Sequence, residues 1–255
     1  MLIYFSATGN TKHVVDEIAH EGEIIIAVDK QKDLKEINLE DNDRLGILAP
    51  SHAGGLPLNV KEFLNDLQIN FDKHPYTFFI GTCGGSTGYS SKQVKDILIK
   101  KGMELDASFA IRMPETFILF SDVNDKEKIA RVNDEANYEI SLIKKRLDNG
   151  VYGNFIDSQV PKFIGNIVQS AYGKFKSTSK FEVSDACISC GTCEKDCPVD
   201  AIKLEDGKPV WVKDSCLLCL RCIHACPTNA IDYGKKTKGK GQYLHSAYNK
   251  NLNNV

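Results

Sequence analysis

Apolar residues along the first 148 positions fall into short continuous runs separated by amphipathic segments. The runs at 1–5, 23–28, 45–50, 76–83 and 107–114 are typical of strands covered on both faces of a sheet. Between them, apolar residues recur every three or four positions at 10–20, 58–67, 90–101 and 132–147, which predicts helices. This alternation indicates an α/β fold with a doubly wound parallel sheet, in which ligands bind at the carboxyl ends of the strands.

Composition places the chain among ordinary globular proteins. Its 255 residues, 42% of them hydrophobic and 26% charged, suffice for one packed domain and a smaller second one. A formal net charge of -2 gives no reason to expect a nucleic-acid partner. The first residues do not form a secretory signal, and no apolar run is long enough for a membrane span. We therefore expect a cytoplasmic protein.

Eight of the nine cysteines lie between Cys187 and Cys226, and the ninth is Cys83. A disulfide framework is typical of small secreted proteins and not of a chain with a large cysteine-poor part. The cysteine-rich segment is an internal repeat, CISCGTCEKDCPVDAI and CLLCLRCIHACPTNAI, with the spacing C-x2-C-x2-C-x3-C-P in each copy. This spacing favours [4Fe–4S] clusters, and a pair of zinc sites is the alternative.

The repeat resembles two-cluster bacterial ferredoxins over residues 181–233. In that pattern the fourth cysteine of each motif binds the other cluster. The resemblance implies one cluster on Cys187, Cys190, Cys193 and Cys226, and a second on Cys216, Cys219, Cys222 and Cys197. Between the two motifs, an Asp206-Gly207 turn flanked by extended residues predicts a small hairpin.

A loop rich in hydroxyl and amide groups, SATGNT, follows the first predicted strand. A helix start needs only one such group as a cap, and the free amides of a first helical turn attract anions. The segment IYFSATGNTK resembles the N-terminal signature of flavodoxins. The resemblance implies that the FMN phosphate is bound by Ser6, Thr8, Gly9, Asn10 and Thr11. A capped helix start without a ligand is the alternative.

Two further glycine- and serine-rich loops follow the third and fourth predicted strands, at the edge of the sheet where this fold binds ligands. The resemblance implies that they contact the flavin ring through Ser51, His52, Ala53, Gly54, Gly55, Thr82, Cys83, Gly84, Gly85, Ser86 and Tyr89. His52 and Tyr89 are candidates for stacking on the ring, and Cys83 is expected to be a buried structural thiol. We expect the loop after the last strand, residues 112–120, to lie near the flavin edge.

These patterns and the two resemblances predict four parts of the chain. They are a flavodoxin-like FMN-binding domain at 1–148 with strand order 2-1-3-4-5, a linker with an amphipathic helix at 149–180, a small α+β ferredoxin domain with two [4Fe–4S] clusters at 181–233, and a basic tail at 234–255. We expect the tail to be polar and mobile, and folding back through Tyr243 is the alternative.

The combination resembles the flavodoxin–ferredoxin fusion proteins of anaerobic bacteria and archaea. It implies an electron-transfer protein that relays electrons between two [4Fe–4S] clusters and FMN, as a low-potential carrier between redox partner proteins, a reductase and a client. The alternative is a flavoenzyme that reduces a small oxidant, such as a quinone or dioxygen, at FMN. No acid–base pair for catalysis stands out in the sequence.

Overall fold

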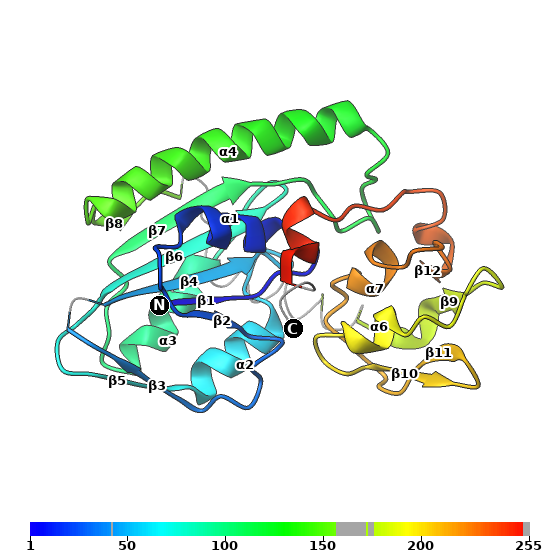
Figure 1. The fold of residues 1–255 in the computed structure, drawn as a ribbon, viewed down its shortest axis with the longest axis horizontal. Coiled ribbons are helices and arrows are strands. Elements are labelled where there is room, and N and C mark those ends of the chain that lie inside the picture. Colours follow the sequence, from blue (N-terminus) through cyan, green and yellow to red (C-terminus); the bar gives the residue numbers. More distant parts are fainter. Residues whose placement is uncertain (42, 157–171, 173–175, 252–255) are drawn as a thin grey trace.

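The computed structural model describes residues 1–41, 43–156, 172 and 176–251 (Figure 1). Its larger part is built on a parallel six-stranded sheet with the order β2-β1-β4-β6-β7-β8. The predicted order 2-1-3-4-5 is confirmed, and one short edge strand is added. The strands are β1 (Leu2–Tyr4), β2 (Ile25–Ala27), β4 (Arg44–Pro50), β6 (Tyr76–Cys83), β7 (Ala107–Arg112) and β8 (Gly153–Asn154).

Helices cover both faces of this sheet, as a near-continuous apolar strand requires. On one face lie α1 (Asn10–Ile18) and α4 (Lys126–Asp148), and on the other lie α2 (Leu58–Asp66) and α3 (Ser90–Ile99) (Figure 1). Because successive side chains of a strand alternate, Leu2 and Tyr4 pack with the first pair of helices. Ile3 and Phe5 pack with the second pair.

Strands β3 (Glu36–Leu39) and β5 (Gln68–Phe71) pair in parallel as a separate two-stranded sheet. They were not predicted, because each alternates apolar and polar residues over only four positions. The predicted helix at 149–180 falls largely on residues 157–171 and 173–175, which lie outside the described residues.

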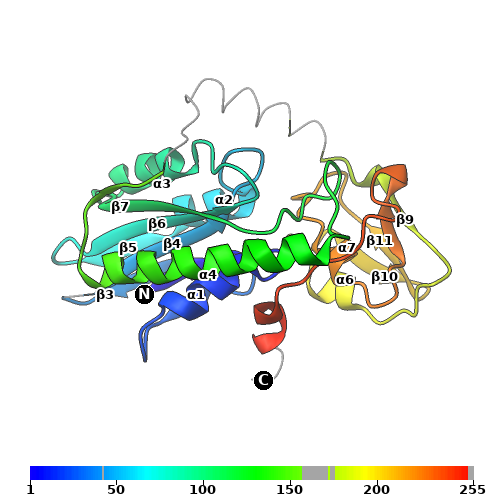
Figure 2. The same cartoon turned by 90° about the horizontal axis from the view of Figure 1, so that it is seen from above.

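The cysteine-rich part consists of two small antiparallel sheets and short helices beside the α/β part (Figure 2). The predicted hairpin is confirmed, since Asp206 and Gly207 connect its strands with φ of 47° and 78°, as a two-residue turn requires. The elements of the cysteine-rich part are η1 (Thr178–Lys180), β9 (Phe181–Val183), α6 (Thr192–Lys195), β10 (Ile202–Glu205), β11 (Lys208–Trp211), α7 (Arg221–His224) and β12 (Ile231–Tyr233). Strand β9 pairs with β12, and β10 and β11 form the hairpin.

The C-terminal segment returns to the α/β part. It contains η2 (Gly234–Lys236) and η3 (Ser246–Asn251), and η3 lies beside α1 (Figure 1). Tyr243 is 8% exposed, and its hydroxyl donates a hydrogen bond to Asn10 Oδ1 at 2.9 Å. The expected mobile tail is therefore wrong for this segment, and the alternative of folding back through Tyr243 is the observed arrangement.

Among the described residues, no helix combines the length and apolar character that crossing a bilayer requires.

Candidate functional site

A cavity of about 720 Å³, here called the large cavity, lies where the central strands of the parallel sheet end. Its volume is within the usual range for cofactor sites. The loops after β1, β4, β6 and β7 line it, and two residues of the second cysteine motif close it from the other part of the chain. The lining residues are Ser6, Ala7, Thr8, Asn10, Thr11, Pro50, Ser51, His52, Ala53, Gly54, Thr82, Cys83, Gly84, Gly85, Ser86, Met113, Pro114, Glu115, Thr116, Phe117, Phe120, Tyr172, Leu218 and Cys219.

The loop at residues 6–11 does not act as a side-chain cap for α1. Gly9 precedes the helix with φ 96°, and no side-chain cap hydrogen bond is present at this position within the described residues. Ser6 Oγ accepts a hydrogen bond from Gly9 N–H at 3.1 Å, within the loop itself. Thr11 Oγ1 lies 2.8 Å from Thr82 Oγ1 on β6. Ser6 and Thr11 also line the large cavity, so their hydroxyl groups lie at its wall.

Several buried polar groups at this wall have no partner within the described residues. The N–H groups of Ala7 and Thr8 make no hydrogen bond there, although these residues are only 8% and 3% exposed. Ser51 Oγ is buried and likewise has no hydrogen-bond partner in the described part of the chain. Buried polar groups normally find a partner, and a phosphate and the polar edge of a ring would supply one. The residues present therefore fit a phosphorylated cofactor such as FMN.

His52 and Cys83 of the ring loops are neutral near pH 7. Burial lowers the pKa of His52 to about 4, and the charge of Lys176 adds to this effect. Burial raises the pKa of the Cys83 thiol to about 11, and the Glu115 carboxylate raises it further. The neutral, half-buried thiol fits the structural role expected for Cys83, since nucleophilic cysteines need a lowered pKa.

Three residues expected at the cofactor do not line the cavity: Gly9, Gly55 and Tyr89. Tyr89 is 3% exposed and precedes α3, where its N–H donates to Gly54 O at 2.8 Å. It is packed in the protein interior, so it is not placed to stack on a ring in this cavity. Gly9 lies behind the wall, where a Cβ atom would come within 3.0 Å of the Tyr248 backbone nitrogen.

The loop at residues 112–120, expected near the flavin edge, lines the cavity through residues 113–117 and Phe120, whereas Tyr172, Leu218 and Cys219 were not expected there. Phe120 is 81% exposed at the cavity, and the rings of Phe117 and Tyr172 lie 6.1 Å apart in an edge-on arrangement. Leu218 and Cys219 belong to the cysteine-rich part. Their position depends on how the two parts of the chain pack together, and no local pattern carries that information.

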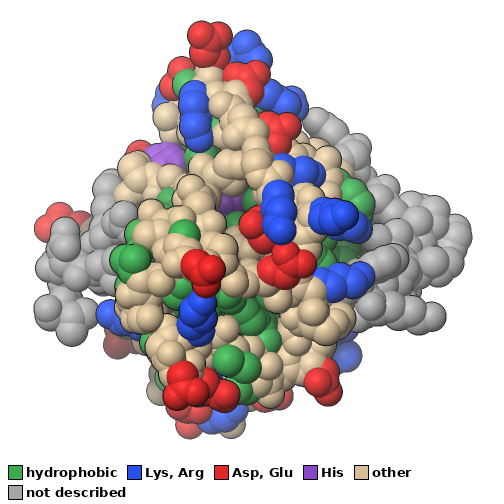
Figure 3. Space-filling model, turned by 90° about the vertical axis from the view of Figure 1, so that its right-hand side faces the viewer, with side chains coloured by type: hydrophobic (Ala, Val, Ile, Leu, Met, Phe, Trp, Pro, Cys, Tyr) green, Lys and Arg blue, Asp and Glu red, His purple; other side chains and the backbone are tan. Residues whose placement is uncertain are grey.

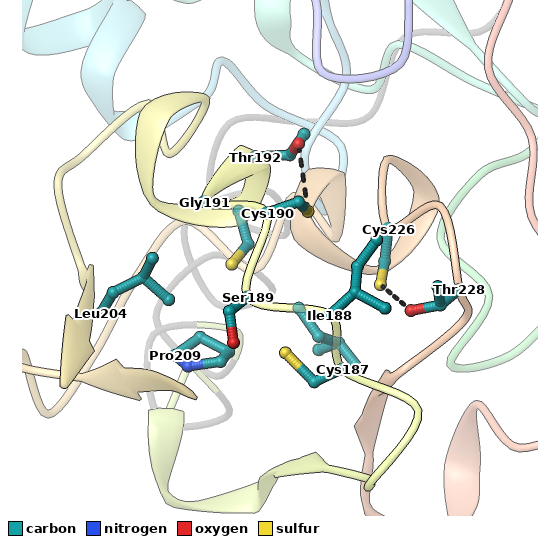
Figure 4. A pocket seen from close by; sticks show the side chains of 12 residues that line it. Cys187, Ile188, Ser189, Cys190, Gly191, Thr192, Leu204, Pro209, Cys226 and Thr228 are labelled. Carbon is teal, nitrogen blue, oxygen red and sulfur yellow. Dashed lines mark hydrogen bonds between the residues drawn. The ribbon is translucent and has the colours of Figure 1, made fainter. Parts of the chain in front are cut away.

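Two smaller cavities bring together the two predicted sets of cysteines. The first cysteine cavity is lined by Cys187, Cys190, Cys193 and Cys226, and Figure 4 labels Cys187, Cys190 and Cys226. The second cysteine cavity is lined by Cys197, Cys216, Cys219 and Cys222. Each set joins three cysteines of one motif to the fourth cysteine of the other, as the ferredoxin pattern implies.

The repeat also shows in the backbone around these cavities. Ser189 and Leu218, at equivalent positions of the two motifs, have φ of 58° and 50°. Ala201 N–H donates to Cys197 Sγ and Ala230 N–H donates to Cys226 Sγ, both at 3.2 Å. Amide donors to sulfur stabilise the negative charge of a thiolate-bound cluster.

Burial raises the pKa of the Cys216 thiol to about 12, and it also raises the pKa of Cys222. Thiolates at these positions therefore require nearby positive charge, which iron supplies. Within the described residues, no group of three or more His, Cys, Asp or Glu side chains is arranged to hold a single metal ion.

The two cysteine cavities differ in their surroundings. Cys190 is exposed and its neighbour Ile188 is 62% exposed, so the first cavity lies near the surface. The second is lined by Phe181 and Trp211, whose rings stack 4.4 Å apart. Figure 3 shows the outer side of the cysteine-rich part, where hydrophobic side chains are interspersed with acidic and basic ones.

His224, which lies within the second cysteine motif, lines neither cysteine cavity. It is 2% exposed and its Nε2 lies 2.8 Å from Thr116 O, to which it donates. Its Nδ1 accepts a hydrogen bond from Tyr243 N–H at 3.3 Å. Both ring nitrogens of His224 are thus used in hydrogen bonds outside the two cysteine cavities.

The sequence matches two protein families in separate segments: the flavodoxin domain at residues 1–138 and the 4Fe-4S dicluster domain at residues 186–231. It is also 53% identical over 30 residues to a ferredoxin of Acetoanaerobium sticklandii, covering 12% of this chain and 54% of that protein. The chain thus spans about half the length of this curated relative.

Two solved structures are similar at 16% identity and a TM-score of 0.32. Rubredoxin oxygen:oxidoreductase from Desulfovibrio gigas is matched over 57% of this chain and 36% of its own. A short-chain flavodoxin associated with a non-canonical PDU bacterial microcompartment is matched over 55% of this chain and 96% of its own.

The two family matches indicate FMN and iron–sulfur as the cofactors and electron transfer as the role.

Proposed function

We propose that this chain, which belongs to the flavodoxin domain family and also carries a 4Fe-4S dicluster domain, relays electrons between two [4Fe–4S] clusters and one FMN. In this proposal it is a low-potential carrier between a reductase and a client protein. When bound, FMN would exchange one or two electrons and each cluster one. The residues of the chain hold these groups, set the distances between them and exclude water.

One observation carries the proposal: Cys219 lines both the second cysteine cavity and the large cavity. A cluster held by Cys219 would share a wall with a flavin held by the loops of the α/β part. The two groups would then exchange electrons within one chain, at a high effective concentration of each for the other.

Each cofactor has a set of residues suited to hold it. The loop at residues 6–11 and the first turn of α1 would bind the FMN phosphate, and the loops after β4 and β6 would bind the ring. The first cluster would be held by Cys187, Cys190, Cys193 and Cys226, and the second by Cys197, Cys216, Cys219 and Cys222.

The exposure of the two cysteine cavities supports an order for the relay. Cys190 and Ile188 place the first cavity at the surface, where a redox partner protein would approach it. The second cavity shares Cys219 with the large cavity and is lined by Cys197 from the first motif, so it contacts both. Electrons would therefore pass between the partner and the flavin by way of the first and then the second cluster.

Cofactor analysis of protein purified without oxygen tests this function. We expect about eight irons, about eight acid-labile sulfides and about one FMN per chain, and no stoichiometric zinc. Zinc in place of iron, or the lack of flavin uptake on titration, would contradict the proposal. Sustained consumption of dioxygen or a quinone by the reduced protein would instead support the alternative, a flavoenzyme.

A further inference from the structure

Arg221 is a buried cation in the middle of the second cysteine motif, between Cys219 and Cys222. It begins α7 and is 5% exposed. A buried guanidinium group is costly unless its donors and its charge are matched. The groups that match Arg221 come mainly from the other part of the chain, so its position depends on both parts.

The guanidinium group donates hydrogen bonds in several directions. Nε donates to Ala7 O at 2.9 Å and Nη2 donates to Ser6 O at 2.5 Å. Nη1 donates to Asp196 O at 2.8 Å and to Asp29 Oδ2 at 2.5 Å. The Arg221 and Asp29 side chains are 6% and 5% exposed, so this ion pair is shielded from water and salt.

The bonds to Ser6 and Ala7 fix the orientation of two peptide groups. In a trans peptide the carbonyl oxygen and the next residue's N–H point in opposite directions. With the Ser6 and Ala7 carbonyls turned toward Arg221, the N–H groups of Ala7 and Thr8 point away from it. Ala7 and Thr8 line the large cavity, and these N–H groups have no partner within the described residues.

We propose that Arg221 is a positioning residue for FMN: it holds the backbone of the 6–11 loop so that two amides face the cofactor phosphate. Consecutive amides pointing the same way form an anion site. The second cysteine motif would then contribute to the phosphate site through Arg221, without touching the phosphate. This inference rests on the proposed binding of FMN in the large cavity.

The chemistry of the side chain explains why arginine is needed here. Its planar fork binds both loop carbonyls at once, while another nitrogen reaches Asp29. A lysine would keep the charge and would reach only part of this set. The guanidinium carbon also lies over the ring of Phe5, the residue directly before the loop, at 5.5 Å from the ring centre. This cation–π contact adds to the interactions that hold the group.

A comparison of FMN with riboflavin, which lacks the phosphate, tests the inference. The dissociation constants of both are measured by fluorescence titration of the anaerobic, cluster-loaded protein as wild type, Arg221→Met, Arg221→Lys and the exposed control Arg131→Met. For Arg221→Met we expect FMN binding to weaken about 10- to 100-fold, and riboflavin binding to change less than about 3-fold. Arg221→Lys should fall between Arg221→Met and wild type, and Arg131→Met should match wild type.

The outcomes separate this inference from the proposed function. Equal losses of FMN and riboflavin affinity, or no loss, in a variant that retains its iron would overturn the role of Arg221. Loss of iron from both Arg221 variants would also overturn it, because Arg221 would then serve folding and cluster assembly. If wild-type protein binds neither flavin, the proposed function itself fails.

Discussion

Replacement of Thr11 by valine tests which hydroxyl group reaches the FMN phosphate. Thr11 Oγ1 and Thr82 Oγ1 lie 2.8 Å apart, both residues line the large cavity, and they are 1% and 2% exposed. Thr11 lies in the first turn of α1, where the helix end attracts anions, whereas Thr82 lies on β6. We therefore expect Thr82 to donate its proton to Thr11, and Thr11 to donate its own to the phosphate.

This proton order predicts unequal effects of two similar variants. A hydrogen bond to a charged group contributes about 1.5–3 kcal/mol, so Thr11→Val should weaken FMN binding about 10- to 100-fold. Thr82→Val leaves the Thr11 donor in place, and its FMN affinity should change less than about 3-fold. Anaerobic fluorescence titration measures both constants. Equal losses, or a larger loss for Thr82→Val, would refute the reasoning.

The double variant Thr11→Val/Thr82→Val is the control for stability. Each single variant leaves one buried hydroxyl without its partner, at a cost of about 1–3 kcal/mol, whereas the double variant removes both groups. The double variant should therefore have a higher Tm in thermal unfolding than either single variant. Its FMN affinity should still match that of Thr11→Val, because binding depends on the Thr11 hydroxyl and not on overall stability.

Three further changes have defined outcomes. Cys219→Ala should lower the iron content from about eight to about four per chain while FMN stays bound, measured by metal and flavin analysis. Tyr243→Phe removes hydrogen bonds to Asn10 and Asn133 and should cost about 1–2 kcal/mol, measured as a lower Tm. The pKa of His52 is about 6.5 in the unfolded chain and about 4 in the folded protein, so the unfolded state binds more protons and acid favours unfolding. The Tm should therefore fall more steeply from pH 7 to 5 in wild type than in His52→Gln.

The strands of the sheet were predictable because each central strand is a short apolar run buried on both faces, and their order was implied by the resemblance to flavodoxins. Strand β8 was not, since Gly153 and Asn154 carry no apolar signal and pair only by tertiary contact with β7. The C-terminal segment reads as a polar tail, and its order comes from particular contacts. Tyr243 bonds to Asn10, and His245 N–H donates to Thr8 O at 2.8 Å.

The two sets of cysteines were predictable because the repeat resembles two-cluster ferredoxins, in which the fourth cysteine of each motif binds the other cluster, and the cavities group the same residues. The loops of the large cavity were also predictable, since they follow parallel strands whose ends meet at one edge. The roles of Arg221 and of Cys219 at the boundary of two cavities were not. Both depend on how the two parts of the chain pack, which leaves no periodic trace in the sequence.

The rate of electron transfer from cluster to flavin tests the central claim most directly. A flash-generated reductant reduces the cluster-loaded, FMN-bound protein, and absorbance follows the clusters and the flavin separately over a tenfold range of protein concentration. The shared wall at Cys219 predicts cluster reoxidation matched by flavin reduction at a rate independent of protein concentration. A rate proportional to protein concentration would contradict a relay within one chain.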